Sequence, residues 1–196
     1  MKIIEHKKDI TNLKTLINAK NIKNEPVLLH LGAGSQLLEG YINIDINDHT
    51  ITDFVLDLRD MALPIECIDA IQIHHVFEHF TEYEGELLLN KWFLWLKKKG
   101  TLTVSVPDLE CCLTKYCANT YSFEMLLNQI YRGRCRDNKE TDSSKEWRDA
   151  NTHKFGYSPT TLAQCLSTAG FNTVKQVAPP ANRQDNGITI TYKATK

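Results

Sequence analysis

The stretch from Val27 to Asp45, VLLHLGAGSQLLEGYINID, limits most narrowly which folds this chain can adopt. An apolar run, a Gly-x-Gly loop and a second short apolar run ending in an acidic residue follow in order, as they do in nucleoside-binding α/β domains. Gly32 and Gly34 lack the β-carbon that would keep a ligand away from a tight turn. Asp45 ends the second run, where a carboxylate can accept hydrogen bonds from both ribose hydroxyls. We therefore predict a nucleoside site at this edge of a sheet.

Length and charge limit the number of domains and the classes of partner. The chain has 196 residues, so we expect one domain over 1–196, with a helical extension over 1–24. Its 23 lysines and arginines nearly balance 24 acidic residues, which argues against nonspecific nucleic-acid binding. The six cysteines contain no C-x-x-C pair, which indicates reduced thiols.

The N-terminus has no apolar core of a signal peptide, and the richest apolar run, 87–96, is interrupted by Asn90 and Lys91. We therefore expect no membrane span and a cytoplasmic location.

Predicted strands and helices alternate along the chain, which is typical of a mostly parallel sheet. A helix is expected around 10–17, and another over 83–98 that ends at Gly100 as C-cap, with Lys97, Lys98 and Lys99 suiting the helix dipole. A helical region covers 109–131, and Ser158 with Pro159 begins a helix that ends at Gly170. Strands are predicted at 27–31, 41–44, 54–56, 70–73, 101–106, 171–177 and 188–192. Because the last two strands lack room for a helix between them, we expect one antiparallel strand near the C-terminus.

Several of these segments resemble those of class I S-adenosylmethionine (SAM) dependent methyltransferases. LHLGAG resembles the first SAM motif, INID the ribose-binding strand end, and Asp57-Leu58 the pair beside the adenine. LKKKGTLTVSVPD resembles the entry to a later strand, with Lys99-Gly100-Thr101 in place of Pro-Gly-Gly. The resemblance implies a Rossmann-like α/β sheet with helices on both faces, an enzyme, and SAM as cofactor. The cofactor-binding residues it implies are Gly32, Ala33, Gly34, Asp45, Asp57, Leu58 and His74.

The spacing between the Gly-loop and Asp45 is short, because Ser35 to Gly40 leaves room for hardly more than one helical turn. With GYINIDI and HVFEH, this compact form resembles methyltransferases of glycan and surface-polysaccharide biosynthesis. The resemblance implies O-methylation of a sugar hydroxyl, with a carbohydrate or nucleotide-sugar as acceptor. Another small molecule or an RNA 3' end are the alternative acceptors.

A cluster of imidazole and carboxylate side chains follows the strand predicted at 70–73. An enzyme that methylates a hydroxyl must hold the acceptor opposite the sulfonium, which contributes up to about 7 to 11 kcal/mol, and must remove a proton. His75, Glu78 and His79 are the predicted catalytic residues, since their spacing places them on one face if this turn is helical. The alternative for each histidine is a hydrogen-bonded core residue.

A second segment, THKFGYSPTTLAQCL, resembles one that supplies a metal-binding histidine in small-RNA 3'-terminal 2'-O-methyltransferases. Those enzymes also carry an acid-x-x-Glu-His motif after the fourth strand. Position by position, the resemblance implies a divalent metal held by His75, Glu78, His79 and His153. Because His75 replaces the acid, Mn, Fe or Zn is favoured over Mg.

Acceptor contacts are predicted from a basic stretch, Arg132 to Arg148, within a segment 132–152 expected to be a lid or loop. Arg132 and Arg134 are predicted to pair with a phosphate or acidic sugar, and Tyr157 to contact the acceptor. A solvated loop is the alternative.

Two interpretations from other classes remain. His75 to His79 also fits the H-x-x-E-H pattern of zinc peptidases, but those need the motif within a long helix, whereas here it follows a buried strand. The other interpretation is a non-catalytic subunit with the SAM-binding fold that binds a partner enzyme.

Overall fold

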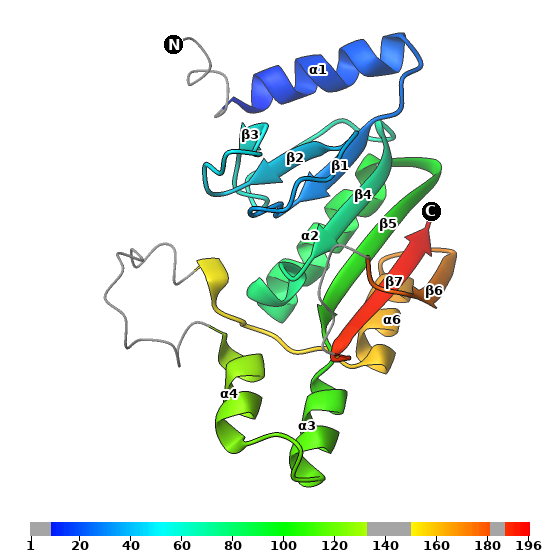
Figure 1. The fold of residues 1–196 in the computed structure, drawn as a ribbon. Coiled ribbons are helices and arrows are strands. Elements are labelled where there is room, and N and C mark those ends of the chain that lie inside the picture. The colour runs from blue at the N-terminus through cyan, green and yellow to red at the C-terminus, as the bar shows by residue number, and fades with distance from the viewer. Residues whose placement is uncertain (1–8, 133–149, 181–186) are drawn as a thin grey trace.

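The computed structural model describes residues 9–132, 150–180 and 187–196. Within these ranges seven strands form one sheet in the order β3-β2-β1-β4-β5-β7-β6 (Figure 1). β7 is antiparallel to both of its neighbours and the other pairs are parallel, which confirms the predicted sheet with one antiparallel strand. The strands are β1 (Leu28–Leu31), β2 (Ile42–Asp45), β3 (Phe54–Val55), β4 (Ile68–His74), β5 (Leu96–Pro107), β6 (Thr173–Val177) and β7 (Thr189–Thr195).

The helices begin at the polar caps that the sequence provides. Thr81 forms a capping box with Glu84 at the start of α2, and Ser158 forms one with Thr161 before α6. The helical region predicted over 109–131 is two helices, α3 and α4, which lie beyond the carboxyl end of β5 (Figure 1). The helices are α1 (Ile10–Ile22), α2 (Glu82–Trp95), α3 (Leu109–Cys117), α4 (Phe123–Tyr131) and α6 (Pro159–Thr168), with a 3-10 turn, η2 (Phe77–His79).

The core forms around the central strands, which are buried on both faces as in most parallel sheets. Leu29, Ile71 and Val104, on β1, β4 and β5, have no solvent-exposed surface. Trp92 of α2 is also fully buried and lies 5.8 Å from the ring of Phe77 in η2. This packing fixes the position of η2 against the end of β4.

The predicted end of α2 is wrong. The sequence places the helix end at Lys98 and the C-cap at Gly100, whereas the helix ends at Trp95 and Leu96 is its C-cap. Leu96 is fully buried and begins β5, and the Nζ atom of Lys97 lies 2.7 Å from Oδ2 of Asp69. Burying this leucine contributes about 1.5 to 3 kcal/mol, more than the about 0.3 to 1 kcal/mol that one exposed lysine contributes at a helix C-terminus.

Two other expectations concern cysteines and membranes. Cys67, Cys111, Cys112, Cys117 and Cys165 are free thiols, and Cys135 lies outside the described residues. Among the described residues, we find no helix with the length and apolar character needed to cross a bilayer.

Candidate functional site

A cavity of about 350 Å³ opens where β1, β2 and β4 reach their carboxyl ends. The volume falls in the usual range of about 300 to 1,000 Å³ for small-molecule sites. In an open α/β sheet, ligands bind in the crevice outside these strand ends, where the strand order reverses. All the predicted cofactor-binding residues line this cavity: Gly32, Ala33, Gly34, Asp45, Asp57, Leu58 and His74.

The two glycines of the loop after β1 are needed for different reasons. Both have left-handed backbone, with φ of +67° at Gly32 and +55° at Gly34. A β-carbon on Gly32 would lie 2.3 Å from Cγ2 of Val76, so the packing of the protein itself requires glycine there. A β-carbon on Gly34 would have no protein atom within 4 Å, so protein packing does not explain this glycine. Open space above Gly34 fits the close approach of a ligand.

The Asp45 carboxylate is held by backbone donors at the end of β2. The N–H of Gly34 donates to Oδ2 and that of Asn47 donates to Oδ1, each over 2.8 Å. A carboxylate oxygen can accept more than one hydrogen bond, so both oxygens retain capacity for ribose hydroxyls. The geometry therefore fits the ribose-binding role implied for this residue.

Asp57 forms the charged part of the cavity wall. Arg59 donates to its carboxylate from Nε and from Nη2, the latter over 2.6 Å. Burial raises the pKa of Asp57, but these bonds outweigh it and lower the pKa below its ordinary value. The lowered pKa keeps Asp57 ionised, and the hydrogen bonds from Arg59 fix its orientation. Nη1 of Arg59 also lies 3.5 Å from Oε1 of Glu84.

His74 is held at both ring nitrogens. Its Nδ1 lies 2.8 Å from Oγ of Ser105, and its Nε2 lies 2.8 Å from Oε1 of Gln72. Ser105 in turn lies 2.8 Å from Oγ1 of Thr191 on β7. His74 therefore supplies a fixed wall to the cavity rather than an available base.

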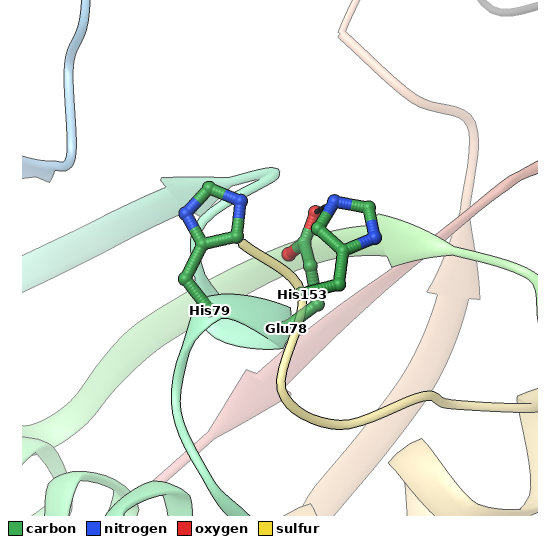
Figure 2. Close-up of side chains that lie close together, drawn as sticks. All are labelled: Glu78, His79 and His153. Atoms are coloured by element: carbon green, nitrogen blue, oxygen red, sulfur yellow. Dashed lines mark ion pairs between the residues drawn. The ribbon is translucent and has the colours of Figure 1, made fainter. Parts of the chain in front are cut away.

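Three buried side chains beside the cavity form a cluster that could hold a metal ion (Figure 2). Glu78 and His79 come from η2, and His153 comes from the segment before α6. One candidate ligand atom of each residue lies within 4.8 Å of the other two. The rings of His79 and His153 stack with centroids 5.3 Å apart. The N–H groups of Lys154 and Phe155 donate to the carbonyl of Glu78, which attaches the His153 segment to η2.

The cluster contains buried polar atoms without hydrogen-bond partners. These are both carboxylate oxygens of Glu78 and the Nε2 atoms of His79 and His153. The Nδ1 atom of His153 lies 2.7 Å from the carbonyl of Gln129. A carbonyl only accepts, so this nitrogen carries the proton and a neutral His153 has its lone pair on Nε2. That lone pair lies 3.7 Å from Oε1 of Glu78, so two electron-rich atoms face each other.

Electrostatics keep Glu78 ionised and both histidines of the cluster neutral at neutral pH. Burial raises the pKa of Glu78, but His75, His79 and His153, which are positively charged at low pH, outweigh it and lower the pKa to about 2. Burial lowers the pKa of His79 to about 4, partly opposed by Glu78, and it also lowers the pKa of His153. The result is one carboxylate beside two neutral imidazoles, which is a donor set suited to Mn, Fe or Zn. An unpaired buried charge is costly, so these residues fit a bound divalent cation better than an empty site.

His75, the fourth predicted ligand, lies outside this cluster. Its backbone φ is +55°, so the helical spacing assumed for His75, Glu78 and His79 does not apply. Its Nδ1 lies 3.6 Å from Oε1 of Glu78, and its Nε2 lies 3.3 Å from Oγ1 of Thr189. The structure therefore brings three of the four predicted ligands together and leaves His75 beside the Glu78 carboxylate, where it also lines the cavity.

The predicted acceptor contacts have three different outcomes. Arg132 lines the cavity at the end of α4, close enough to lower the pKa of His79. Arg134 and the rest of the predicted lid over 133–149 lie outside the described residues. Tyr157 is 2% exposed and stacks on Phe77 at 5.1 Å, so it is a core residue away from the cavity wall.

Several residues of the cavity wall were not predicted as site residues, among them Asn47, His49, Asn151 and Lys154. The last two are close to His153 in the sequence. Arg59 also lines the cavity and donates hydrogen bonds to Asp57. Its only signal in the sequence is its place two residues after that aspartate.

No protein-family profile and no curated protein matches the sequence. Solved structures match it over most of its length. A SAM-dependent methyltransferase from Archaeoglobus fulgidus has a TM-score of 0.56 at 16% identity, covering 96% of this chain and 95% of that one. One from Methanosarcina mazei gives 0.55 at 14%, over 90% and 96% of the chains. Burkholderia thailandensis 1,6-didemethyltoxoflavin-N1-methyltransferase, with S-adenosylhomocysteine bound, gives 0.53 at 13%, over 95% and 77%. The chain therefore has the Rossmann-like fold of SAM-dependent methyltransferases.

Proposed function

We propose that the protein is a SAM-dependent O-methyltransferase whose acceptor is a sugar hydroxyl bound beside a divalent cation. The observation that carries this proposal is the position of the Glu78, His79 and His153 cluster next to a cavity lined by the Gly-loop and Asp45. His79 belongs to both the cluster and the cavity wall, so a molecule in the cavity can reach it.

The cofactor end of the cavity supports SAM. Open space over Gly34, the fixed carboxylate of Asp45 and the Asp57-Leu58 pair provide room for a nucleoside and acceptors for its ribose. The fold is shared with a methyltransferase that has S-adenosylhomocysteine bound, which agrees with this cofactor.

The buried cluster favours oxygen over nitrogen as the methylated atom. The fold does not decide this, because the Burkholderia relative is named as an N1-methyltransferase. A hydroxyl must lose its proton as it attacks, and a bound divalent cation lowers the pKa of a coordinated hydroxyl. Glu78, His79 and His153 would hold such a cation, leaving other positions for two neighbouring oxygens of the acceptor. Without a cation, His79 is the candidate base, because its unpartnered Nε2 is neutral at pH 7.

A carbohydrate or nucleotide-sugar acceptor agrees with these features. Vicinal sugar hydroxyls can chelate one cation, and the compact Gly-loop resembles that of glycan methyltransferases. Arg132 adds a positive charge that could pair with a phosphate or an acidic sugar. The short 3-10 turn that carries Glu78 and His79 gives no support to a zinc peptidase, which needs this motif in a long helix.

The test is a screen for S-adenosylhomocysteine formation from SAM with monosaccharide, nucleotide-sugar and oligosaccharide acceptors. Each acceptor is assayed with added Mn, with chelator, and with the Glu78→Gln variant as the matched control. We expect turnover with Mn that chelator and Glu78→Gln both abolish, while SAM affinity is retained. Turnover only on a protein, an RNA 3' end or a phenol would contradict the sugar acceptor. SAM binding without turnover, together with a co-purifying protein, would favour a non-catalytic subunit.

A further inference from the structure

His75 occupies a position between the cluster and β7 that the proposed reaction does not itself explain. It follows β4 directly, and its N–H donates to the carbonyl of Ser105 over 2.9 Å. Its φ is +55°, a left-handed backbone that is unfavourable for residues other than glycine. Backbone strain of this kind persists only where the surrounding structure holds the residue in place.

Both ring nitrogens of His75 already have neighbours. Nδ1 faces Oε1 of Glu78 at 3.6 Å, and Nε2 faces the hydroxyl of Thr189 at 3.3 Å. With a proton on Nδ1, the ring presents an N–H to the carboxylate and a lone pair to the hydroxyl. No lone pair then remains for a cation or for an acceptor proton. The neighbours of His75 therefore argue against a role as ligand or as base.

The Glu78 carboxylate needs such a neighbour. It is buried, and neither oxygen has a hydrogen-bond partner within 3.5 Å. Its Oε1 lies 3.6 Å from Nδ1 of His75 and 3.7 Å from Nε2 of His153. Residues that orient a ligating carboxylate in this way commonly change metal affinity by 10 to 100-fold when they are removed.

We propose that His75 is a positioning residue that orients the Glu78 carboxylate toward the cation, with its own ring fixed by Thr189 on β7. This inference rests on the proposed cation site, and it assigns three protein ligands where the sequence suggested four. Thr189 is the first residue of β7, so the end of that strand is linked to the cluster through His75.

The test is Co²⁺ titration of the full chain, monitored by visible absorption, because the Co²⁺ spectrum reports the ligand set. His75→Leu removes both contacts, whereas His75→Asn keeps an N–H near the position of Nδ1 and tolerates a left-handed backbone. Thr189→Val removes the hydroxyl without touching the cluster, and Thr189→Ser is its matched control. Circular dichroism is measured for every variant to show that it is folded.

We expect His75→Leu to weaken Co²⁺ binding about 10 to 100-fold with an unchanged spectrum. Thr189→Val should weaken it in the same direction, while His75→Asn and Thr189→Ser should stay within about threefold of the unaltered chain. A changed spectrum in His75→Leu, or an equal loss in His75→Asn, would make His75 a ligand and overturn the inference. Unchanged affinity in His75→Leu would overturn it while leaving the cation site intact. Failure of the unaltered chain to bind Co²⁺ would instead remove the cation site itself, and the inference with it.

Discussion

Acidification should destabilise the metal-free protein through His79. Burial holds the pKa of this residue at about 4 in the folded chain, compared with an ordinary value of 6.5. The unfolded chain therefore binds a proton below pH 6.5 that the folded chain does not take up until about pH 4. The free energy of unfolding must then fall as the pH decreases through this window.

The size of the effect follows from the shift. A pKa of about 4 in place of 6.5 corresponds to a loss of about 3 kcal/mol when the whole window is crossed, since each tenfold change in proton affinity is about 1.4 kcal/mol. His79 is 8% exposed, so solvent screening reduces this value little. The pKa of His153 is also lowered, which adds a loss of the same sign. The contribution of His79 alone is isolated by comparison with His79→Gln, which has no proton to bind at this position.

The measurement is urea unfolding of both chains in chelator at pH 7.5 and pH 4.5. We expect the unaltered chain to lose about 2 kcal/mol more than His79→Gln between these values. NMR titration of the His79 ring gives an independent value for its pKa. Equal losses in the two chains, or a ring that titrates near pH 6.5, would refute the argument that burial keeps this imidazole neutral.

Three further predictions concern the cavity. Asp45→Asn should weaken SAM binding by about 1 to 3 kcal/mol in calorimetry, because a charged acceptor of ribose hydroxyls is lost, and unchanged affinity would contradict the ribose role. Gly34→Asn should reduce S-adenosylhomocysteine affinity at least about tenfold, because the new side chain would enter the cavity. Gly40→Asn should leave the affinity unchanged, because Gly40 has the same left-handed backbone and open space for a β-carbon but does not line the cavity. Arg132→Met should lower kcat/KM for anionic acceptors about tenfold and leave neutral ones unchanged, and an equal effect on both would favour a solvated side chain.

The sheet and the grouping of the predicted cofactor residues around one cavity could be predicted from the sequence because their signals are local. A buried strand, a Gly-x-Gly turn and a terminal acid occupy a continuous segment, and all seven predicted cofactor residues line the cavity. The end of α2 could not be predicted, because it depends on the burial of Leu96 and on the pairing of Lys97 with Asp69. Those contacts join segments far apart in the sequence.

The cluster could be predicted only in part for a related reason. Glu78 and His79 are neighbours in sequence, but His153 reaches them through the hydrogen bonds of Lys154 and Phe155 to the carbonyl of Glu78. A resemblance to another enzyme family, and not the spacing along the sequence, predicts that His153 belongs to the cluster. The role of His75 depends on one backbone angle and on Thr189, neither of which leaves a pattern in the sequence.

The cost of burying the charge of Glu78 leads to a last prediction, in which stability and cation binding respond in opposite directions. In the metal-free protein, the ionised Glu78 is buried without a hydrogen bond and faces the lone pair of His153. Glu78→Gln removes the charge and supplies an N–H that can donate to that lone pair. We expect it to raise the free energy of unfolding in chelator by about 1 to 3 kcal/mol while Co²⁺ binding is lost. Urea unfolding with and without Co²⁺ measures both effects. If Glu78→Gln instead destabilises the metal-free chain, a protonated histidine already compensates the carboxylate, and the cluster would be a structural ion pair.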